Sequence, residues 1–272
     1  MKSILITGAT SGIGLATAHA LHKQGWHIHG SGLPEDDFTH LAEVGAHITP
    51  VKLDITDNAS VQQLVAQIQA PLNALMNNAG VTVPGALLDL DIEAIQQQFE
   101  VNVFGHLRVT QTVLPLLAPD ARIVMVSSVM GRVAMPALGA YSMSKHAIEA
   151  MADTLRLELA DTSMRVISVQ MGAIDTPLTQ HIAQKMQEKA HTSERFTRLY
   201  HGMVRALQQQ ARYAIPPEKV ASVITRAVTS NQPKTRYAVD PATRGLLMMR
   251  KYAPDALGDW ILRRSLGLYP KE

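Results

Sequence analysis

Short apolar runs alternate along the chain with stretches whose apolar residues recur every three or four positions. Runs such as SILIT (3–7), ARIVMVSS (121–128) and RVISVQM (165–171) are continuous and rich in β-branched residues. Such runs are typical of strands buried on both faces of a parallel sheet, whereas the periodic stretches predict helices. Strands that alternate with helices favour an α/β architecture, and the right-handed crossover rule then predicts a doubly wound (Rossmann) parallel sheet.

The same pattern sets the expected boundaries. Strands are predicted at 3–7, 26–30, 47–54, 72–78, 121–128, 165–171 and 234–240, and helices from about 13, near 38–44, and at 59–69, 91–117, 140–161 and 216–230. We expect a single domain over 1–272. It would include a helical segment, 178–212, after the sixth strand, and a helical C-terminal tail, 241–272, which Pro254 interrupts.

A tyrosine and a lysine interrupt the apolar stripe of the helix predicted at 140–161. Tyr141 and Lys145 share one helix face with Ile148, Ala152 and Leu155, and that face points inward. Burying a lysine costs hydration energy, so its presence needs a reason. Either the lysine runs its stem along the core and reaches water, or the two residues form an acid/base device.

Polar and glycine residues follow several of the predicted strands. Ligands of doubly wound sheets lie beyond the carboxyl ends of the strands, so these positions are candidates for binding. TGATSGIG (7–14) follows the first strand, Asp54 the third and NNAG (77–80) the fourth. A glycine turn before a helix suits a pyrophosphate, although the spacing here is G-x3-G-x-G. Asp54 is either an acceptor for an adenine amino group or a turn aspartate.

Composition narrows the class of protein. The chain has 272 residues, 46% of them hydrophobic, and no cysteine, which excludes disulfides, thiolate catalysis and cysteine-ligated metal clusters. The apolar run near the start is four residues long, too short for a signal peptide or a membrane span, and predicts a cytoplasmic protein. The eleven histidines lack a metal-binding pattern, so we expect surface histidines and no metal site.

Charge is divided unevenly along the chain. Residues 1–177 contain 9 Lys and Arg against 16 Asp and Glu, whereas residues 178–272 contain 16 against 7. The basic last third either meets an anionic partner or presents a solvated face. We expect no nucleic-acid partner.

The motifs together resemble the short-chain dehydrogenase/reductase family, in its single-domain branch. The resemblance covers the chain as far as about Thr176. It depends on TGATSGIG, Asp54, NNAG, the asparagine of VNVFG (Asn102), the serine of VSS and the sequence YSMSK (141–145). It implies an oxidoreductase that moves a hydride between a nicotinamide cofactor and an alcohol or ketone. The tyrosine would move a proton at the substrate oxygen, and the ammonium of Lys145 would lower its pKa.

The resemblance also implies roles for individual residues. The implied catalytic residues are Asn102, Ser128, Tyr141 and Lys145. Ser127 and Ser128 point to opposite sides of a strand, and Ser128 has the family's spacing of thirteen positions before Tyr141; Ser127 would bond the backbone. Asn102 would hold a relay water near Lys145, or satisfy a local backbone group. The implied cofactor-binding residues are Gly8, Ser11, Gly12, Ile13, Gly14, Gly32, Leu33, Asp54, Ile55, Asn78, Ala79, Gly80, Tyr141, Lys145, Ile174 and Thr176. The chain departs from the family at Met171-Gly172, where Pro-Gly is usual.

The choice between NAD and NADP depends on the end of the second strand. Residues 30–34 offer no base for a 2′-phosphate, and Glu35, Asp36 and Asp37 follow. Carboxylates repel a dianionic phosphate, so NAD is favoured over NADP.

The substrate is predicted from the apolar character of two segments. Segment 178–212, in the position of the family's substrate lid, and the flank 129–141 favour a bulky apolar alcohol or ketone, as in steroid and retinol dehydrogenases. Alternatively, the apolar residues only pack the lid onto the body. The basic surplus would also suit an anionic or acyl-thioester ketone.

The family resemblance also bears on binding partners and on alternative functions. The family implies a homodimer or homotetramer. The tail either lies on an anionic membrane surface or, as we favour, covers the pocket or a neighbouring subunit. The alternative to an enzyme is a non-catalytic NAD(P)-binding regulator on the same fold. An epimerase or dehalogenase would show a different glycine spacing or an arginine in place of Lys145.

Overall fold

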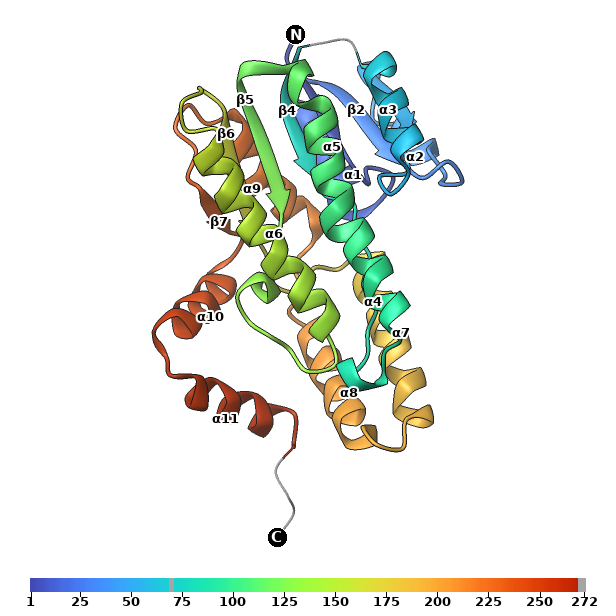
Figure 1. The fold of residues 1–272 in the computed structure, drawn as a ribbon, viewed down its shortest axis with the longest axis vertical. Helices are drawn as coiled ribbons and strands as arrows, with labels where there is room; N and C mark the ends of the chain where they lie inside the picture. Colours follow the sequence, from blue (N-terminus) through green and yellow to red (C-terminus); the bar gives the residue numbers. More distant parts are fainter. Residues whose placement is uncertain (69–70, 269–272) are drawn as a thin grey trace.

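A computed structural model describes residues 1–68 and 71–268; Gln69, predicted as helical, and 269–272, predicted as part of the tail, lie outside the described residues. Seven parallel strands form one sheet in the order β3-β2-β1-β4-β5-β6-β7 (Figure 1). The strands are β1 (Ser3–Ile6), β2 (His27–Gly32), β3 (Ile48–Lys52), β4 (Leu72–Asn77), β5 (Leu117–Val126), β6 (Arg165–Gln170) and β7 (Arg236–Ala238). The predicted doubly wound parallel sheet is confirmed.

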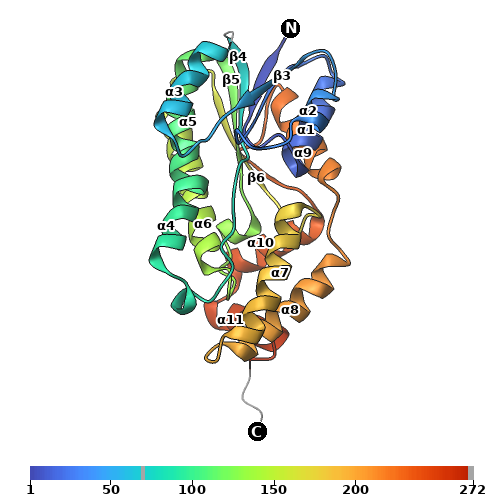
Figure 2. The same ribbon diagram turned by 90° about the vertical axis from the view of Figure 1, so that its right-hand side faces the viewer.

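Helices cover both faces of this sheet (Figure 2). They are α1 (Gly12–His22), α2 (Thr39–Ala42), α3 (Asn58–Gln67), α4 (Ile92–Phe99), α5 (His106–Val113), α6 (Gly139–Glu158), α7 (Pro177–Thr192), α8 (Thr197–Ala211), α9 (Pro217–Thr229), α10 (Pro241–Tyr252) and α11 (Asp255–Ser265). Successive strand residues point to opposite faces, which divides the core in two. Ile4 and Ile6 pack with α1 and α9, whereas Leu5 packs with α3, α5 and α6.

The order of the strands determines where in the sheet the site lies. The chain moves outward from β1 to β3 and then returns to β4 on the other side of β1. Loops that leave adjacent strands in opposite directions open a crevice at this switch point, beyond the carboxyl ends of the strands. The glycine turn after β1 and the NNAG turn after β4 therefore lie side by side.

The long helix predicted at 91–117 is wrong in detail. A π-helical turn, Glu100–Gly105, separates α4 from α5, and α5 ends at Val113. The sequence then makes a short 3-10 turn that contains Pro115, and β5 begins at Leu117 rather than at 121. Pro115 lacks the backbone N–H that would continue the α-helical hydrogen bonds, which ends the helix early. Asn102 lies within this π-turn.

The prediction that the histidines lie at the surface is wrong for two of them. His29 on β2 is 4% exposed and His106 on α5 is fully buried. The ring of His29 stacks on that of His27 with centroids 4.6 Å apart, because residues two apart on a strand share a face. No group of three or more potential metal ligands is found within the described ranges.

Helices α7 and α8 form the segment predicted as a lid. They pack on each other and on the flank of α6 through an apolar cluster that contains Leu138, Met186, Tyr200 and Met203. Leu266, just after α11, joins this cluster and fixes the tail against α8. Throughout the described part of the chain, no helix is both long enough and apolar enough to cross a membrane.

Candidate active site

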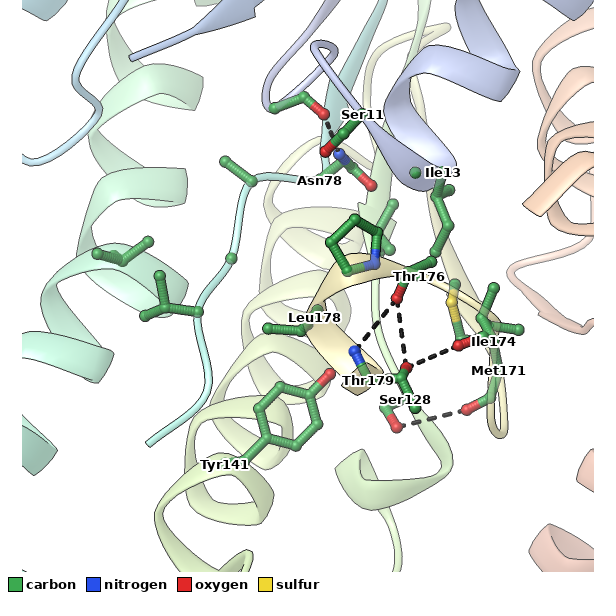
Figure 3. A pocket seen from close by; sticks show the side chains of 18 of the residues that line it. Ser11, Ile13, Asn78, Ser128, Tyr141, Met171, Ile174, Thr176, Leu178 and Thr179 are labelled. Carbon is green, nitrogen blue, oxygen red and sulfur yellow. Dashed lines mark hydrogen bonds between the residues drawn. The ribbon is translucent and has the colours of Figure 1, made fainter. Parts of the chain in front are cut away.

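A cavity of about 430 Å³ lies beyond the carboxyl ends of the central strands. Its walls come from the turns after β1, β2, β3, β4, β5 and β6 and from α6, α7 and α8 (Figure 3). Every predicted cofactor-binding residue lines it except Gly14, which packs behind the glycine turn. Of the four predicted catalytic residues, Ser128, Tyr141 and Lys145 line the cavity and Asn102 does not.

The glycine turn has a shape that only glycine permits. Gly8 has a φ of 66° and Gly12 a φ of 53°, a region that side chains disfavour. A Cβ on Gly14 would lie 2.0 Å from the carbonyl oxygen of Gly8, which leaves no room for a side chain. The turn leads into the N-terminus of α1, whose free N–H groups and dipole favour an anion.

Asn78 holds this turn in place. Its Nδ2 donates to the carbonyl oxygens of Thr7 and Gly8, both at 2.8 Å. The Thr7 hydroxyl in turn accepts from the backbone N–H groups of Asn78 and Ala79 at 2.9 and 3.1 Å. The two motifs thus form one rigid wall of the cavity.

Two carboxylates line the end of the cavity near β2 and β3. Asp54 Oδ1 accepts from the N–H and hydroxyl of Thr56 at 2.8 and 2.7 Å, so the turn-aspartate interpretation is correct, while the carboxylate still faces the cavity. Asp36 Oδ2 accepts from the Leu33 N–H at 2.9 Å and the Thr10 hydroxyl at 3.1 Å. Of the three acidic residues at 35–37, only Asp36 lines the cavity.

Tyr141 and Lys145 lie one turn apart on the inner face of α6. Tyr141 projects into the cavity (Figure 3). Lys145 is 4% exposed, and its Nζ donates to the Val126 carbonyl oxygen at 2.8 Å. The lysine therefore does not reach water, and the snorkelling interpretation is wrong. Its Nζ lies 5.6 Å from the centre of the Tyr141 ring.

Burial dominates the protonation of both groups. It raises the pKa of Tyr141 to about 12, against a smaller downward effect of the Ser128 hydroxyl. Burial also lowers the pKa of Lys145 to about 8, although the Glu149 carboxylate acts in the opposite direction. The expected lowering of the tyrosine pKa by the lysine is thus not found: desolvation sets the direction of the shift, and the opposing effect comes from Ser128.

The two serines after β5 point in different directions. Ser128 faces the cavity, where its hydroxyl accepts from the Met130 N–H at 3.2 Å and donates to the Met171 carbonyl oxygen at 3.4 Å (Figure 3). The predicted backbone hydrogen bond of Ser127 is wrong, since its hydroxyl bonds no backbone group among the described residues. The Ser127 hydroxyl instead faces Glu149 and helps to lower its pKa.

Asn102 lies in the π-turn, is buried, and does not line the cavity. Its Oδ1 accepts from the Val81 N–H and its Nδ2 donates to the Val81 carbonyl oxygen, both at 2.9 Å. Nδ2 also donates to Ser144 at 3.2 Å. These bonds match the local backbone role, and they join α6 to the loop after β4.

His106 is a site residue that the sequence pattern did not indicate. Its Nε2 bonds the Ala79 carbonyl oxygen at 2.6 Å behind the cavity wall. Burial and the nearby Lys145 lower the pKa of His106 to about 3. The ring is therefore neutral near pH 7, and Nε2 carries the proton that the carbonyl accepts.

A buried carboxylate lies one turn beyond Lys145. Glu149 is 2% exposed, accepts from the Ser168 hydroxyl, and pairs with Arg236 at 3.0 Å and Arg132 at 3.3 Å. Burial raises the pKa of Glu149, but the hydrogen bonds outweigh this effect and the net shift is downward. An ionised Glu149 favours the charged form of Lys145.

The other end of the cavity is mainly apolar. Met130, Leu138, Leu178, Ile182 and Leu207 line it. The polar residues here are Ser128, Tyr141, Thr179 and Gln210. Apolar residues from α7 and α8 were predicted here, but not which of them face the site, because helical spacing alone does not fix the packing of one helix on another.

The residues fit a dinucleotide. The glycine cradle would hold a pyrophosphate, the carboxylate end would accept hydrogen bonds from sugar or base groups, and the Tyr141 end would hold the reacting ring. None of the tail residues from Pro241 to Leu268 is among the cavity residues, so the first part of the expectation, that the tail covers the pocket, is wrong for the described part of the chain. The second part, that the tail covers a neighbouring subunit, stays a prediction.

Comparison with known proteins agrees with this geometry. A statistical model of the family described as short chain dehydrogenase matches residues 2–187. An uncharacterized oxidoreductase of Escherichia coli, YbbO, is 33% identical over 268 residues, which cover 96% of this chain and 94% of the relative. An NADPH-dependent 3-dehydrocapnine reductase of Ornithobacterium rhinotracheale is 30% identical over 278 residues, with 98% of both chains covered. A 3-ketodihydrosphingosine reductase of Bacteroides thetaiotaomicron is 30% identical over 266 residues, with 96% of both covered.

A solved structure is similar throughout. The crystal structure of a short chain dehydrogenase/reductase from Burkholderia phymatum in complex with NAD has a TM-score of 0.78 and 25% identity, covering 94% of this chain and 95% of that one. The chain therefore belongs to the short chain dehydrogenase family, and it is an NAD(P)-dependent oxidoreductase.

Proposed function

We propose that the protein uses NAD(H) to interconvert a bulky apolar ketone and its alcohol, and that it favours reduction. The observation that carries this proposal is the placement of Tyr141 and Ser128 at the apolar end of a cavity whose other end carries a glycine cradle and two carboxylates. A bound nicotinamide would supply or accept the hydride at the substrate carbon.

Tyr141 is proposed as the group that handles the proton. Because burial raises its pKa to about 12, the phenol holds its proton at neutral pH. A protonated phenol beside a carbonyl oxygen donates that proton as the carbon gains a hydride, so that the C=O group becomes CH–OH. Ser128 would hold the same oxygen with its hydroxyl. These assignments favour reduction, the direction in which both named reductases among the relatives work.

Lys145 is proposed to stabilise the phenolate left after proton transfer. With a pKa of about 8, it is mostly charged at pH 7. Its Nζ donates one bond to Val126, and an ammonium has three donors. The remaining donors are free to face the cavity. Asn102 is proposed to support this arrangement from behind by linking α6 to the loop after β4.

NAD rather than NADP is proposed from the charges near β2. Asp36 and Asp54 are carboxylates, and among the described residues lining the cavity the single basic side chain is Lys145, which lies at the opposite end. A carboxylate accepts a bond from a ribose hydroxyl and repels a 2′-phosphate. The capnine relative depends on NADPH, so the acidic lining predicts a difference between the two proteins.

The substrate class is proposed from the apolar lining. A ketone with a large apolar body would replace water against Met130, Leu138 and Leu207, with its oxygen between Ser128 and Tyr141. Steroids and retinoids were predicted as examples of this class, but the relatives are named for other ketones, so the proposal is the broader class of bulky apolar ketones. Homo-oligomer formation and a cytoplasmic location remain parts of the proposal.

Two measurements test this function. Fluorescence titrations with NADH and NADPH should show binding of both forms, with NADH at least tenfold tighter. Turnover, measured by nicotinamide absorbance, should be fastest with bulky apolar ketones and slow with small ketones and β-keto thioesters. Ile182→Asn should reduce this preference for bulky apolar ketones. Cofactor binding without turnover on any ketone or alcohol would favour a regulator, and faster turnover of the thioesters would contradict the substrate class.

A further inference from the structure

Helices α10 and α11 leave large apolar side chains exposed. Met248 and Tyr252, four residues apart on α10, are 49% and 69% exposed, and Leu257 and Trp260, three residues apart on α11, are 47% and 48% exposed. Residues at these spacings share a helix face. Each helix therefore presents an apolar stripe to solvent, and contiguous exposed apolar area marks an interaction surface.

Basic residues frame both stripes. Arg244 lies one turn before Met248, and Arg264 lies one turn after Trp260, with its guanidinium 5.6 Å from the indole ring. Lys251 lies 5.2 Å from the ring of Tyr252. In all, α10 and α11 carry five basic residues, Arg244, Arg250, Lys251, Arg263 and Arg264, and two acidic ones, Asp255 and Asp259. Arg250 is paired with Asp255, which leaves the surface positive.

The two helices are anchored beside the substrate end of the molecule (Figure 1). A Cβ added to Gly202 on α8 would lie 2.3 Å from the carbonyl oxygen of Leu266, so the chain after α11 lies directly against α8. A Cβ on Gly172, which lines the cavity, would lie 3.2 Å from the Thr243 hydroxyl on α10. Thus α10 and α11 lie next to the cavity without closing it.

The positive charge of this surface indicates which kind of partner it binds. A second copy related by twofold symmetry would bring the same basic residues together, and like charges oppose such an interface. An anionic bilayer meets both features, because its phosphates attract arginine and lysine while apolar and aromatic side chains enter the interface between headgroups and acyl chains. Helices with aromatic and basic residues at the edge of an apolar stripe are typical of this binding mode.

We propose that α10 and α11 dock the protein on an anionic lipid bilayer, with Met248, Tyr252, Leu257 and Trp260 in the headgroup region and the basic residues against lipid phosphates. The proposal concerns where the protein acts, and it does not depend on the identity of the substrate.

Vesicle flotation of the full-length protein tests the proposal. The vesicles are pure phosphatidylcholine, or phosphatidylcholine with 30% phosphatidylglycerol. We expect at least tenfold stronger partitioning into the anionic vesicles, weakened by high salt. Tryptophan emission gives a second readout, because Trp26 is 5% exposed and Trp260 is 48% exposed; in Trp26→Phe, a blue shift on binding would report Trp260 alone.

Matched variants separate the alternatives. Tyr252→Ser with Trp260→Ser should reduce partitioning at least tenfold, as should Arg263→Gln with Arg264→Gln, whereas Tyr213→Ser, which replaces an aromatic residue 82% exposed outside the tail, should leave it unchanged. Circular dichroism and melting temperature confirm folding of each variant. The proposal is overturned if the protein does not bind anionic vesicles, or if the arginine variant reduces partitioning and the aromatic variant does not. It is also overturned if Tyr252→Ser with Trp260→Ser dissociates an oligomer while vesicle binding is absent.

Discussion

The ammonium of Lys145 lies 5.6 Å from the centre of the Tyr141 ring, one turn further along the same face of α6. Lys145 is buried and Tyr141 is half-buried at the cavity wall, and desolvation moves their pKa values in opposite directions: that of Tyr141 rises to about 12 and that of Lys145 falls to about 8. The pair therefore consists of a phenol that holds its proton and an ammonium that remains mostly charged near neutral pH. A proton donor beside a fixed positive charge is suited to reducing a carbonyl.

Replacing Lys145 with methionine should stabilise the fold while it impairs the reaction. The folded pKa of about 8 lies below the ordinary value of 10.5, so the unfolded chain binds more protons between these pH values. The wild-type free energy of unfolding should rise with pH across that window, and Lys145→Met should remove the rise. At pH 7 the variant should be more stable by about 1–2 kcal/mol, since a buried charge is removed. Urea unfolding between pH 7 and 10 measures the stability gain at pH 7 and the pH dependence of stability, with the exposed Lys219→Met as control. A variant whose stability depends on pH as strongly as that of wild type would contradict the prediction.

His106 should make the fold sensitive to acid. Its pKa falls from 6.5 to about 3 on folding, so the unfolded chain binds more protons between these values and stability is lost as the pH drops through that range. About 2 kcal/mol should be lost from this residue by pH 5. His106→Gln keeps a donor for Ala79 but does not titrate, so it should flatten the pH dependence measured by chemical denaturation. The exposed His40→Gln should leave the dependence unchanged, and an unchanged slope in His106→Gln would show that another group is responsible.

Features that depend on residues close together in the chain were predictable from the sequence, whereas features that depend on distant contacts were not. The α/β alternation, the glycine turn and the Tyr141 stripe were predictable because each depends on residues close together in the chain. Asp36 was not singled out from its acidic neighbours, because its position depends on a turn in which it bonds Leu33 and Thr10. The π-turn at Asn102 and the burial of His106 depend on contacts with residues 21 and 27 positions away, which periodicity does not report.

Gly14→Ala should disrupt the cofactor cradle. The new methyl group would lie 2.0 Å from the carbonyl oxygen of Gly8, so the turn must move. We expect cofactor affinity to fall at least about tenfold and stability by about 1–3 kcal/mol. Gly258→Ala is the matched control, since nothing lies within 4 Å of a Cβ there and alanine favours a helix interior. Isothermal titration with NADH and thermal melts compare the two variants, and normal binding by Gly14→Ala would argue against the cradle.

Asp36→Ala should weaken the preference for NAD. Its carboxylate lines the cavity near the end of β2, where it would bond a ribose hydroxyl and repel a phosphate. We expect NADH affinity to fall about tenfold and NADPH affinity to rise, in line with the strength of a charge-assisted hydrogen bond. Glu35→Ala, an exposed neighbour that does not line the cavity, should change neither. Parallel titrations with NADH and NADPH measure these affinities. Equal effects of the two variants would show that Asp36 does not determine the preference for NAD.

The most direct test of the central claim is the turnover of Tyr141→Phe with its cofactor affinity measured on the same preparation. The phenylalanine ring keeps the shape of the site and removes the proton that the phenol donates. We expect kcat to fall by about 10²–10⁴-fold, while NADH binding stays within about threefold of wild type. Turnover close to that of wild type, with binding intact, would show that Tyr141 does not supply the proton.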